Sequence, residues 1–200
     1  MTGGAPVVTA LRKSGRGRVA VELDGEPWRV LPIDPVLAAG LATGVVLDRQ
    51  RARRLRGELR RADALRAGLT ALRFSDHTAT SLGRRLEDRG IAPAQRDAVI
   101  RTFEQAGLVD DSRVAHGRAH ALAARGAGNE LIRADLERRG VSAELAADAI
   151  GLLEPESERV RRVLAAEGRS VSVLRRLAAK GFSEDVLEEF VADEGETEVR

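Results

Sequence analysis

The sequence contains one spacing of apolar residues three times, and each copy is built around a basic residue, a glycine and an apolar residue. These steps are Arg89-Gly90-Ile91, Arg139-Gly140-Val141 and Lys180-Gly181-Phe182. A leucine stands four residues before each glycine, and a second aliphatic residue stands eight before it. The pattern covers 32 residues without an insertion. A repeat of this kind identifies the building block of a fold, because each copy forms the same supersecondary unit.

The aligned apolar positions predict a block of three short helices, which in the first copy lie near 63–74, 78–89 and 93–106. Residues four apart share one face of a helix, so each block has an apolar seam that it cannot bury alone. Stacked blocks bury the seam, which predicts a mainly α fold with tandem three-helix repeats in an elongated array. The aligned positions are Leu86, Leu136, Leu177; Leu82, Ile132, Val173; Leu72, Leu122, Val163; Leu69, Ala119, Val160; Val99, Ala149, Phe190; and Ile100, Ile150, Val191.

The glycine of each block is expected to end the second helix. Glycine tolerates the positive φ of a Schellman closure, and a cation at the last helical residue suits the negative end of the helix dipole. Ser142 and Ser183 then precede the third helix and are expected to cap it. In the first copy the pair Ala92-Pro93 takes this place.

The residues before the repeats predict a small antiparallel β module followed by a short helix. Strands are expected over 7–11, 18–23 and 27–31, with Asp24-Gly25 as a two-residue turn. Pro27 has no N–H group to donate, so the third strand is expected at an edge of the sheet. Asp34-Pro35 predicts the start of a helix that ends at Gly40.

These patterns divide the chain into six segments. Asp48 is expected to cap a basic helix that continues or kinks into the first repeat. The segments are 1–48, the β-meander with its short helix; 49–61, a basic linking helix; 62–109, 110–154 and 155–193, the three repeats; and 194–200, an acidic tail.

Several classes of chemistry are disfavoured by the residues that the chain lacks. Without cysteine there is no disulfide, thiolate metal site or cysteine nucleophile. His116 and His120 stand four apart on a predicted helix, but no third ligand accompanies them, so we interpret them as surface histidines. No phosphate loop, dinucleotide motif or local catalytic set is present. We therefore expect a non-catalytic protein without a cofactor or metal.

The composition also bears on partners and location. Aromatic residues make up only 2% of the chain, which argues against an aromatic platform for stacking bases. The sequence has no run of about 18 apolar residues and no hydrophobic signal region. We expect a cytoplasmic protein that does not bind membranes and is a monomer.

Basic residues concentrate in one segment although the net charge is only +2, with eight arginines against three acids from Asp48 to Arg66. Four of the arginines share one face of the predicted helix, and six more recur near the ends of the second helix of each repeat. These ten residues are the candidate contacts with nucleic acid or with a protein filament: Arg49, Arg53, Arg56, Arg60, Arg84, Arg85, Arg138, Arg139, Arg175 and Arg176.

Three interpretations of these arginines stay open. They can be a solvated face that reflects the excess of arginine over lysine in the composition, 31 to 2. They can contact phosphates, which predicts binding that is independent of sequence and steeply dependent on salt. At the helix ends they can simply favour the helix dipole.

The most specific local motif is Gly107-Leu108-Val109-Asp110-Asp111. Glycine is expected to end one helix, Leu108 and Val109 to dock the link, and Asp110 or Asp111 to cap the next helix. The structural interpretation, a link that fixes the angle between repeats, is sufficient to explain it.

These motifs, in this order, resemble those of the RecX family of bacterial regulatory proteins. Gly107–Ala115 is similar to the family's G-L-[IV]-D-D-x-R-[FY]-A, and the resemblance extends over residues 7–193. Val114 replaces the usual aromatic residue, and Ser75-Asp76-His77 replaces the usual leucine and basic-proline segment. The other similar segments are Ala71–Phe74, Leu136–Val141 and Lys180–Leu187.

The resemblance implies a non-catalytic regulator in DNA repair, homologous recombination and the SOS response. Such a protein binds the filament of the RecA recombinase and inhibits its strand exchange and ATPase activity. Single- or double-stranded DNA is a further candidate partner. The alternatives are a sequence-independent nucleic-acid-binding protein that uses the arginine-rich helix, and a helical adaptor for some other protein.

Overall fold

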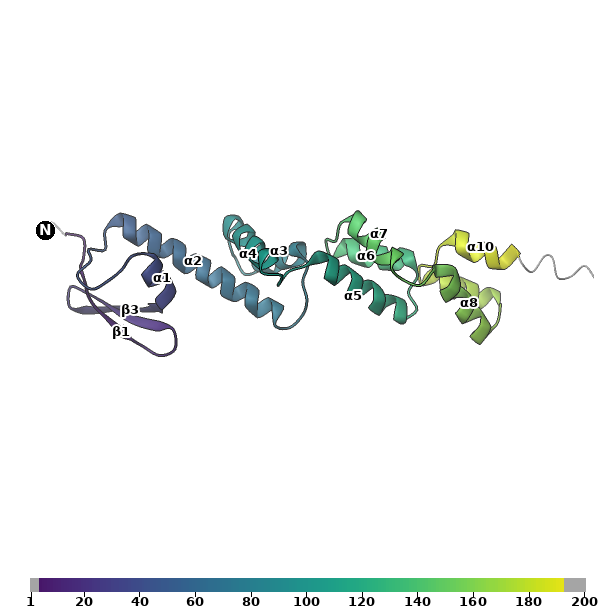
Figure 1. The fold of residues 1–200 in the computed structure, drawn as a ribbon, viewed down its shortest axis with the longest axis horizontal. Coiled ribbons are helices and arrows are strands. Elements are labelled where there is room, and N and C mark those ends of the chain that lie inside the picture. Colours follow the sequence, from purple (N-terminus) through teal and green to yellow (C-terminus); the bar gives the residue numbers. More distant parts are fainter. Residues whose placement is uncertain (1–3, 193–200) are drawn as a thin grey trace, which may run out of the picture. The chain divides into compact units, whose positions relative to one another are not determined.

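The computed structural model describes the backbone of residues 4–192 and the side chains of residues 4–190. Along this part of the chain a three-stranded antiparallel sheet comes first and helices follow (Figure 1). The predicted fold class, mainly α with a small β module at the N-terminus, is confirmed. The predicted acidic tail, 194–200, lies outside the described residues.

The sheet has the strand order β1-β2-β3, with β1 at Val8–Lys13, β2 at Arg18–Leu23 and β3 at Glu26–Pro32. β3 therefore lies at an edge of the sheet, as expected from the missing N–H group of Pro27. The turn between β2 and β3 has positive φ at Asp24 (51°) and Gly25 (87°), which is the backbone geometry of a tight two-residue hairpin. The Asp24 carboxylate accepts a hydrogen bond from the Val7 N–H at 2.8 Å and so ties this turn to the start of β1.

One face of the sheet carries the core of the N-terminal module. Buried residues of all three strands pack there with α1, Ile33–Ala38, and with the first half of α2, Arg49–Leu72. Figure 1 shows both helices on the same side of the sheet. The buried members are Val8, Val19, Val21, Leu31, Val36, Ala39, Leu41, Leu47 and Leu55.

The start of α1 differs from the prediction. The helix begins at Ile33, and its cap position is Pro32 with no side-chain hydrogen bond, so Asp34 lies in the first turn and is not the cap. The reason is that β3 runs directly into the helix, and Pro32 makes the change of direction with φ −59° and ψ 139°. Gly40 follows the helix with φ +70°, as predicted.

The arginine-rich segment and the first helix of the first repeat form a single helix, α2. Asp48 caps it, because its Oδ1 accepts a hydrogen bond from the Arg51 N–H at 2.7 Å. Leu55 is buried on the sheet, whereas Ala64 is buried further along. These two residues are nine apart, about two and a half turns, so they lie on opposite sides of the helix.

This change of buried face corrects one expectation for the first repeat. The pattern predicted Leu69 in the seam, but its side chain is 48% exposed. Ala64 and Ala71, at 0% and 3% exposure, are buried instead. The continuous helix brings a different row of residues inward, so the seam of the first copy is shifted relative to the equivalent Ala119 and Val160, which are buried as predicted.

The remaining helices follow the predicted blocks closely. In each block the second helix ends two or three residues before its glycine. The bounds are α3, Ala79–Glu87, and α4, Pro93–Gln105; α5, Asp111–Ala124, α6, Asn129–Arg138, and α7, Ala143–Gly151; and α8, Glu156–Glu167, α9, Val171–Ala179, and α10, Glu184–Ala192.

All three predicted glycine closures are present. Gly90, Gly140 and Gly181 have φ of +72°, +81° and +81°. In each closure the N–H after the glycine donates to the carbonyl of the leucine four residues before it, at 3.1, 3.1 and 3.2 Å. This pairing defines a Schellman closure, and it satisfies carbonyls that the end of the helix would otherwise leave unpaired.

The contacts divide the chain into two compact units. The N-terminal unit consists of Met1–Thr70 and Leu86–Val99, and the C-terminal unit of Ala71–Arg85 and Ile100–Arg200. The helices of the first repeat contribute residues to both units, whereas α5 to α10 belong wholly to the C-terminal unit. The seams at Ile132 and Leu136 and at Val173 and Leu177 are buried in separate clusters of this unit. The proposed segment boundaries at 61, 109 and 154 stay predictions.

Candidate interaction surface

The four arginines predicted to share a face of α2 do so, and all four are exposed: Arg49, Arg53, Arg56 and Arg60. They point to solvent because the neighbouring residues Ala52, Leu55 and Leu59 pack against the core of the sheet. Arg56 Nε donates to the Ala52 carbonyl at 3.2 Å. None of the four forms an ion pair with a described residue, so their charge is free to meet an outside anion.

The six arginines near the ends of the second helices are also exposed, but the structure groups only some of them. Arg84 Nη1 donates to the Arg138 carbonyl at 3.3 Å. Burial lowers the pKa of His77, and the charges of Arg85 and Arg139, which both lie close to it, lower this pKa further. Arg176 is paired with Glu167, and no described residue pairs with Arg175. The first four therefore gather at one place in the C-terminal unit.

That place is a junction at which the start of α3 meets the end of α6. The buried hydroxyl of Thr78 donates to the Arg139 carbonyl at 2.6 Å, and the Thr80 hydroxyl donates to the Gly140 carbonyl at 3.3 Å. The Asp111 carboxylate accepts from the Ala79 N–H at 2.7 Å. The Thr78 hydroxyl also accepts from the Ser81 N–H at 3.0 Å, so Thr78 and Asp111 together cap α3, and the hydroxyls at its start donate to the two carbonyls that follow α6.

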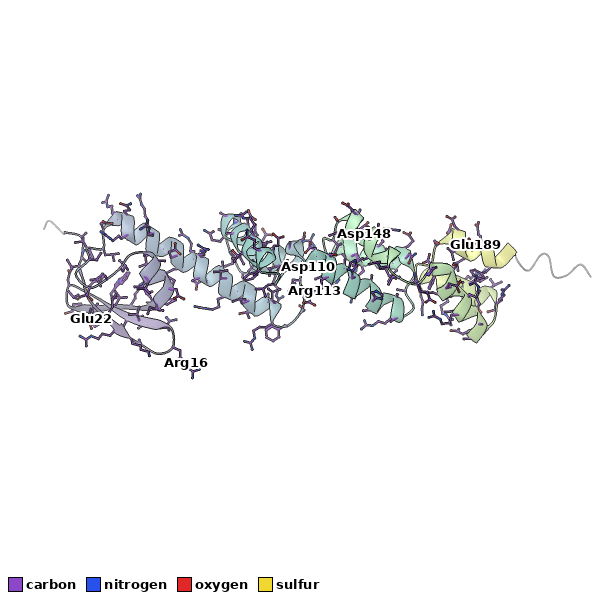
Figure 2. All side chains as sticks on the ribbon, in the orientation of Figure 1. Arg16, Glu22, Asp110, Arg113, Asp148 and Glu189 are labelled. Atoms are coloured by element: carbon purple, nitrogen blue, oxygen red, sulfur yellow. The ribbon has the colours of Figure 1, made fainter. Side chains whose placement is uncertain are left out.

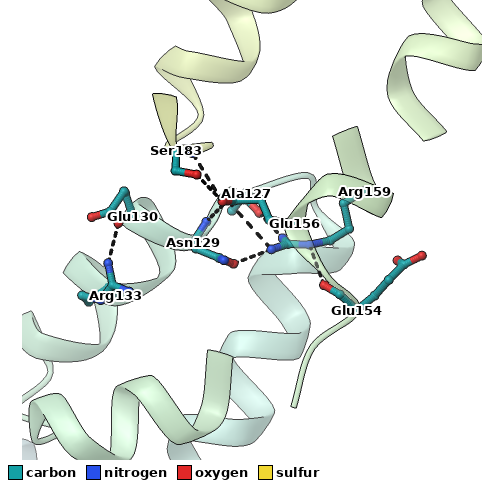
Figure 3. A network of polar contacts seen from close by, with 8 residues as sticks. All are labelled: Ala127, Asn129, Glu130, Arg133, Glu154, Glu156, Arg159 and Ser183. Atoms are coloured by element: carbon teal, nitrogen blue, oxygen red, sulfur yellow. Dashed lines mark hydrogen bonds and ion pairs between the residues drawn. The ribbon is translucent and has the colours of Figure 1, made fainter. Parts of the chain in front are cut away.

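A second junction, between the start of α6 and the end of α9, has the same plan (Figure 3). The Gly128 N–H donates to the Lys180 carbonyl at 2.8 Å, and the Glu130 N–H to the Gly181 carbonyl at 3.0 Å. The Asn129 N–H donates to the Glu156 carboxylate at 2.6 Å. Gly128 and Glu130 stand at the same distances before Gly140 as Thr78 and Thr80 stand before Gly90, so the contact between blocks repeats with the sequence.

The Gly107–Asp111 motif therefore acts at two helices. Asp110 caps α5 through the Arg113 N–H at 2.9 Å, whereas Asp111 caps α3 of the preceding block. Figure 2 shows Asp110 and Arg113 together at the start of α5. Val109 is buried as predicted, but Leu108 is 45% exposed and does not dock the link.

Sequence reasoning missed Arg159, the most buried cation of the described residues. Its Nη1 donates to the Ala127 carbonyl at 2.7 Å, its Nε to the Glu154 carbonyl at 3.2 Å and its Nη2 to Asn129. Burial lowers the pKa of this guanidinium, and the charge of Glu156 opposes that change. Figure 3 shows Arg159 and Glu156 between Ala127, Asn129 and Ser183, so they join three helices by polar contacts. Only the Glu156–Arg159 spacing of three residues, typical of a helical ion pair, hinted at this role.

Ser183 also belongs to this network. It was predicted to cap α10, but its hydroxyl donates to the Glu156 carboxylate at 2.9 Å. Ser142, by contrast, caps α7 as predicted, through the Leu145 N–H at 3.3 Å. The two serines occupy equivalent positions, and the nearby buried carboxylate accounts for the difference.

Asp135 on α6 holds two arginines in place. Its carboxylate accepts from Arg118 Nε at 2.7 Å, from Arg118 Nη2 at 3.1 Å and from Arg139 Nε at 3.0 Å. The hydrogen bonds from Arg118 lower the pKa of the Asp135 carboxyl below its usual 3.8; burial opposes this, and Arg139 adds to it. A carboxyl whose pKa is lower in the folded chain stabilises the fold above pH 3.8, and this contribution is lost as the pH falls through the folded pKa.

We expect Asp135→Asn to lower the free energy of unfolding by about 1–3 kcal/mol at pH 7, because charge-assisted hydrogen bonds are removed. The difference from the parent protein should begin to shrink as the pH falls below 3.8 and should continue to shrink toward the lower pKa of the folded carboxyl, where the parent carboxyl also becomes protonated. Urea unfolding measured from pH 3 to 7 checks this. A deficit that stays constant down to pH 3 would contradict the assignment to the carboxylate charge.

Residues that could hold a metal are not grouped in the part of the chain that the structure describes, where no set of three His, Asp or Glu side chains is suitably placed. His116 and His120 both lie on α5. None of the described helices is long and apolar enough to cross a membrane.

The solved structures that are similar to this chain include two RecX proteins. The structure of a regulatory protein RecX matches with a TM-score of 0.77 at 19% identity, over 92% of this chain and 97% of its own. That of RecX from Lactobacillus salivarius matches with a TM-score of 0.57 at 18% identity, over 67% of this chain and 96% of its own. The chain has the RecX fold. No protein-family model and no curated protein sequence matches it.

The residues that suggested the resemblance have structural roles in this RecX fold. Asp110 and Asp111 cap helices, and Gly140 and Gly181 close helices at the junctions. A match over 92% of the chain requires most of the N-terminal β module to be included. The module is therefore shared with the first of the two RecX structures.

Proposed function

We propose that this protein is a non-catalytic regulator of the RecX type, which binds the RecA recombinase filament and inhibits its strand exchange and ATPase activity. The observation that carries the proposal is the RecX fold, which extends over 92% of the chain. In this proposal it acts as a cytoplasmic monomer in homologous recombination, DNA repair and the SOS response.

The arrangement of the helices supports contact with a repetitive partner. The two junctions of the C-terminal unit use the same positions of the repeat, so successive blocks present related surfaces. Basic residues stand at the exposed ends of the second helices in each block. Several weak contacts of this kind on one chain add to a strong attachment when the partner also repeats, as the protomers of a filament do.

The test is the DNA-dependent ATPase of RecA. We expect the rate to fall when this protein is added to filaments formed on single-stranded DNA, since a regulator that limits the filament lowers the number of active protomers. Retention of the protein on immobilised filaments measures binding directly. A full ATPase rate at severalfold excess, together with no retention, would refute the proposal.

A second candidate function is nucleic-acid binding without RecA, through the arginine face of α2. The observation in its favour is that Arg49, Arg53 and Arg60 are exposed and form no ion pair with a described residue. Replacing Arg53 and Arg60 by alanine separates the two functions. Inhibition of RecA that survives this change favours contact with the protein filament, and its loss together with DNA affinity favours the nucleic-acid function.

A further inference from the structure

A pocket of about 230 Å³ opens beside the first junction of the C-terminal unit. Three arginines line it: Arg113 and Arg118 from α5 and Arg139 from the end of α6. Gly117, Val114 and Ala121 form the wall along α5, and Asp76 is the single lining acid. A ligand can thus approach the helix closely beside three arginine side chains.

The arginines are held by contacts that leave donors free. Asp135 fixes Arg118 through two hydrogen bonds and Arg139 through one. Arg113 Nη1 donates to the Gly107 carbonyl at 3.3 Å. A guanidinium has five N–H groups, so each of the three keeps most of its donors for a ligand. Because the side chains are already positioned, binding costs little further side-chain entropy.

In the lining of the pocket three arginines stand against one acid, Asp76. Behind the lining, Asp135 is shared by Arg118 and Arg139, and Arg113 lies 3.7 Å from Asp110. With Arg85 nearby, four arginines and three carboxylates leave an excess of one positive charge. This excess and the unused N–H donors together favour an anion from outside.

Arg118 and Arg159 occupy the same position of the repeat, one residue before the aligned Ala119 and Val160. Arg159 is buried and donates to the Ala127 carbonyl at 2.7 Å. Arg118 instead lines the pocket and is held by Asp135. At the first junction this arginine therefore keeps donors for a ligand.

We propose that this pocket holds a phosphodiester group of a nucleic-acid strand. The three arginines come from two turns of α5 and from the residue that follows α6, so they line the pocket from two elements. A tetrahedral phosphate offers acceptor oxygens in several directions, whereas the planar carboxylate of a protein partner is satisfied by one guanidinium fork. Arginine contacts to phosphate position a strand without reading its sequence. The site is separate from the arginine face of α2 and requires no RecA.

The test uses a fluorescein-labelled single strand of twenty thymidines, with anisotropy recorded at several salt concentrations and no recombinase present. Gly117→Leu places a side chain in the pocket, since Gly117 lines it. The substitution has room, because a Cβ at this position meets no atom within 4 Å, and leucine also favours the helix. We expect it to weaken binding about tenfold, while Gly117→Ala, which adds little bulk, stays near the parent affinity. Arg113→Gln with Arg139→Gln should weaken binding to a similar degree and reduce the salt slope by about 0.7 for each phosphate that the variant no longer neutralises.

The matched control is Arg53→Gln with Arg60→Gln, which removes the same charge from α2. Loss of binding in this control but not in the pocket variants would overturn the proposal, as would no binding of the strand by the parent protein. Inorganic phosphate, tested alone at constant ionic strength, distinguishes a free phosphate from a nucleic-acid strand as the source of the group. If the parent protein bound inorganic phosphate saturably, lost this binding in Gly117→Leu and did not bind the strand, the proposal would also be overturned. A Gly117→Leu variant that keeps its DNA affinity and loses only RecA inhibition would overturn it too, because the pocket would then serve a protein group. RecA inhibition that is absent while the strand still binds refutes the proposed function alone.

Discussion

Replacing Arg159 by methionine is expected to lower the stability of the C-terminal unit by about 3–5 kcal/mol, the usual cost of removing one partner of a buried ion pair. The side chains of Arg159 and Glu156 are only 8% and 5% exposed, and their charged atoms lie 4.0 Å apart. Without the guanidinium, the Glu156 charge stays buried and the Ala127 carbonyl loses its 2.7 Å hydrogen bond. Methionine keeps much of the volume, so the loss is mainly electrostatic.

The control for this variant is Arg162→Met on the same helix. Arg162 pairs with Glu154 at the surface, with 67% of its side chain exposed, and an exposed pair contributes about 0–1 kcal/mol. Urea unfolding measures both variants, and hydrogen exchange of the Asn129 amide, which donates to Glu156, reports on the junction itself. Equal losses in the two variants, or an unchanged Asn129 exchange rate, would contradict this role of Arg159.

A double variant sharpens the assignment. If the cost of Arg159→Met comes from the stranded charge, then Glu156→Gln in the same chain should recover part of it. The recovery is partial, because glutamine supplies one carbonyl oxygen where Glu156 accepts from both Asn129 and Ser183. Additive losses would place the cost in packing against Phe182, whose ring centre lies 5.5 Å from the guanidinium carbon.

The features that could be predicted from the sequence are those decided within a few residues. Gly140 ends α6 because a left-handed residue closes a helix, and Leu136 is buried because residues four apart form one face. Asp48 and Ser142 cap helices through N–H groups three residues away. Such patterns recur in all three blocks, so the register of the blocks was clear.

The features that could not be predicted depend on contacts between distant residues. Thr78 donates to a carbonyl 61 residues away, and a carbonyl leaves no trace in the residue type. Arg159 resembles any arginine on a helix until Ala127 and Asn129 are placed beside it. The buried face of α2 changes sides because its first half packs on the sheet, which is why Leu69 was assigned wrongly. The candidate arginines were found by composition, but their grouping at one junction required the fold.

Gly181→Ala is expected to be the most destabilising of three glycine substitutions that separate backbone strain from close contact. At Gly181, φ is +81° and an added Cβ would lie 2.5 Å from the Leu131 backbone nitrogen, so both costs apply, in total about 2–5 kcal/mol. Gly90 has φ +72° with nothing within 4 Å of its Cβ position, so Gly90→Ala carries only the strain, about 1–2 kcal/mol.

Gly128→Ala supplies the opposite case, because Gly128 has φ −80° but an added Cβ would lie 2.1 Å from the Phe182 nitrogen. Gly128 and Gly181 face each other across the second junction, where the Gly128 N–H donates to the Lys180 carbonyl. Both substitutions must therefore push α6 and α9 apart, and both should expose the Asn129 amide to hydrogen exchange, whereas Gly90→Ala should leave that amide protected. Urea unfolding should rank the losses with Gly181→Ala first. If Gly90→Ala cost as much as Gly181→Ala, the glycine at this position of the repeat would serve only to close its helix, and the contact between blocks would need no glycine at all.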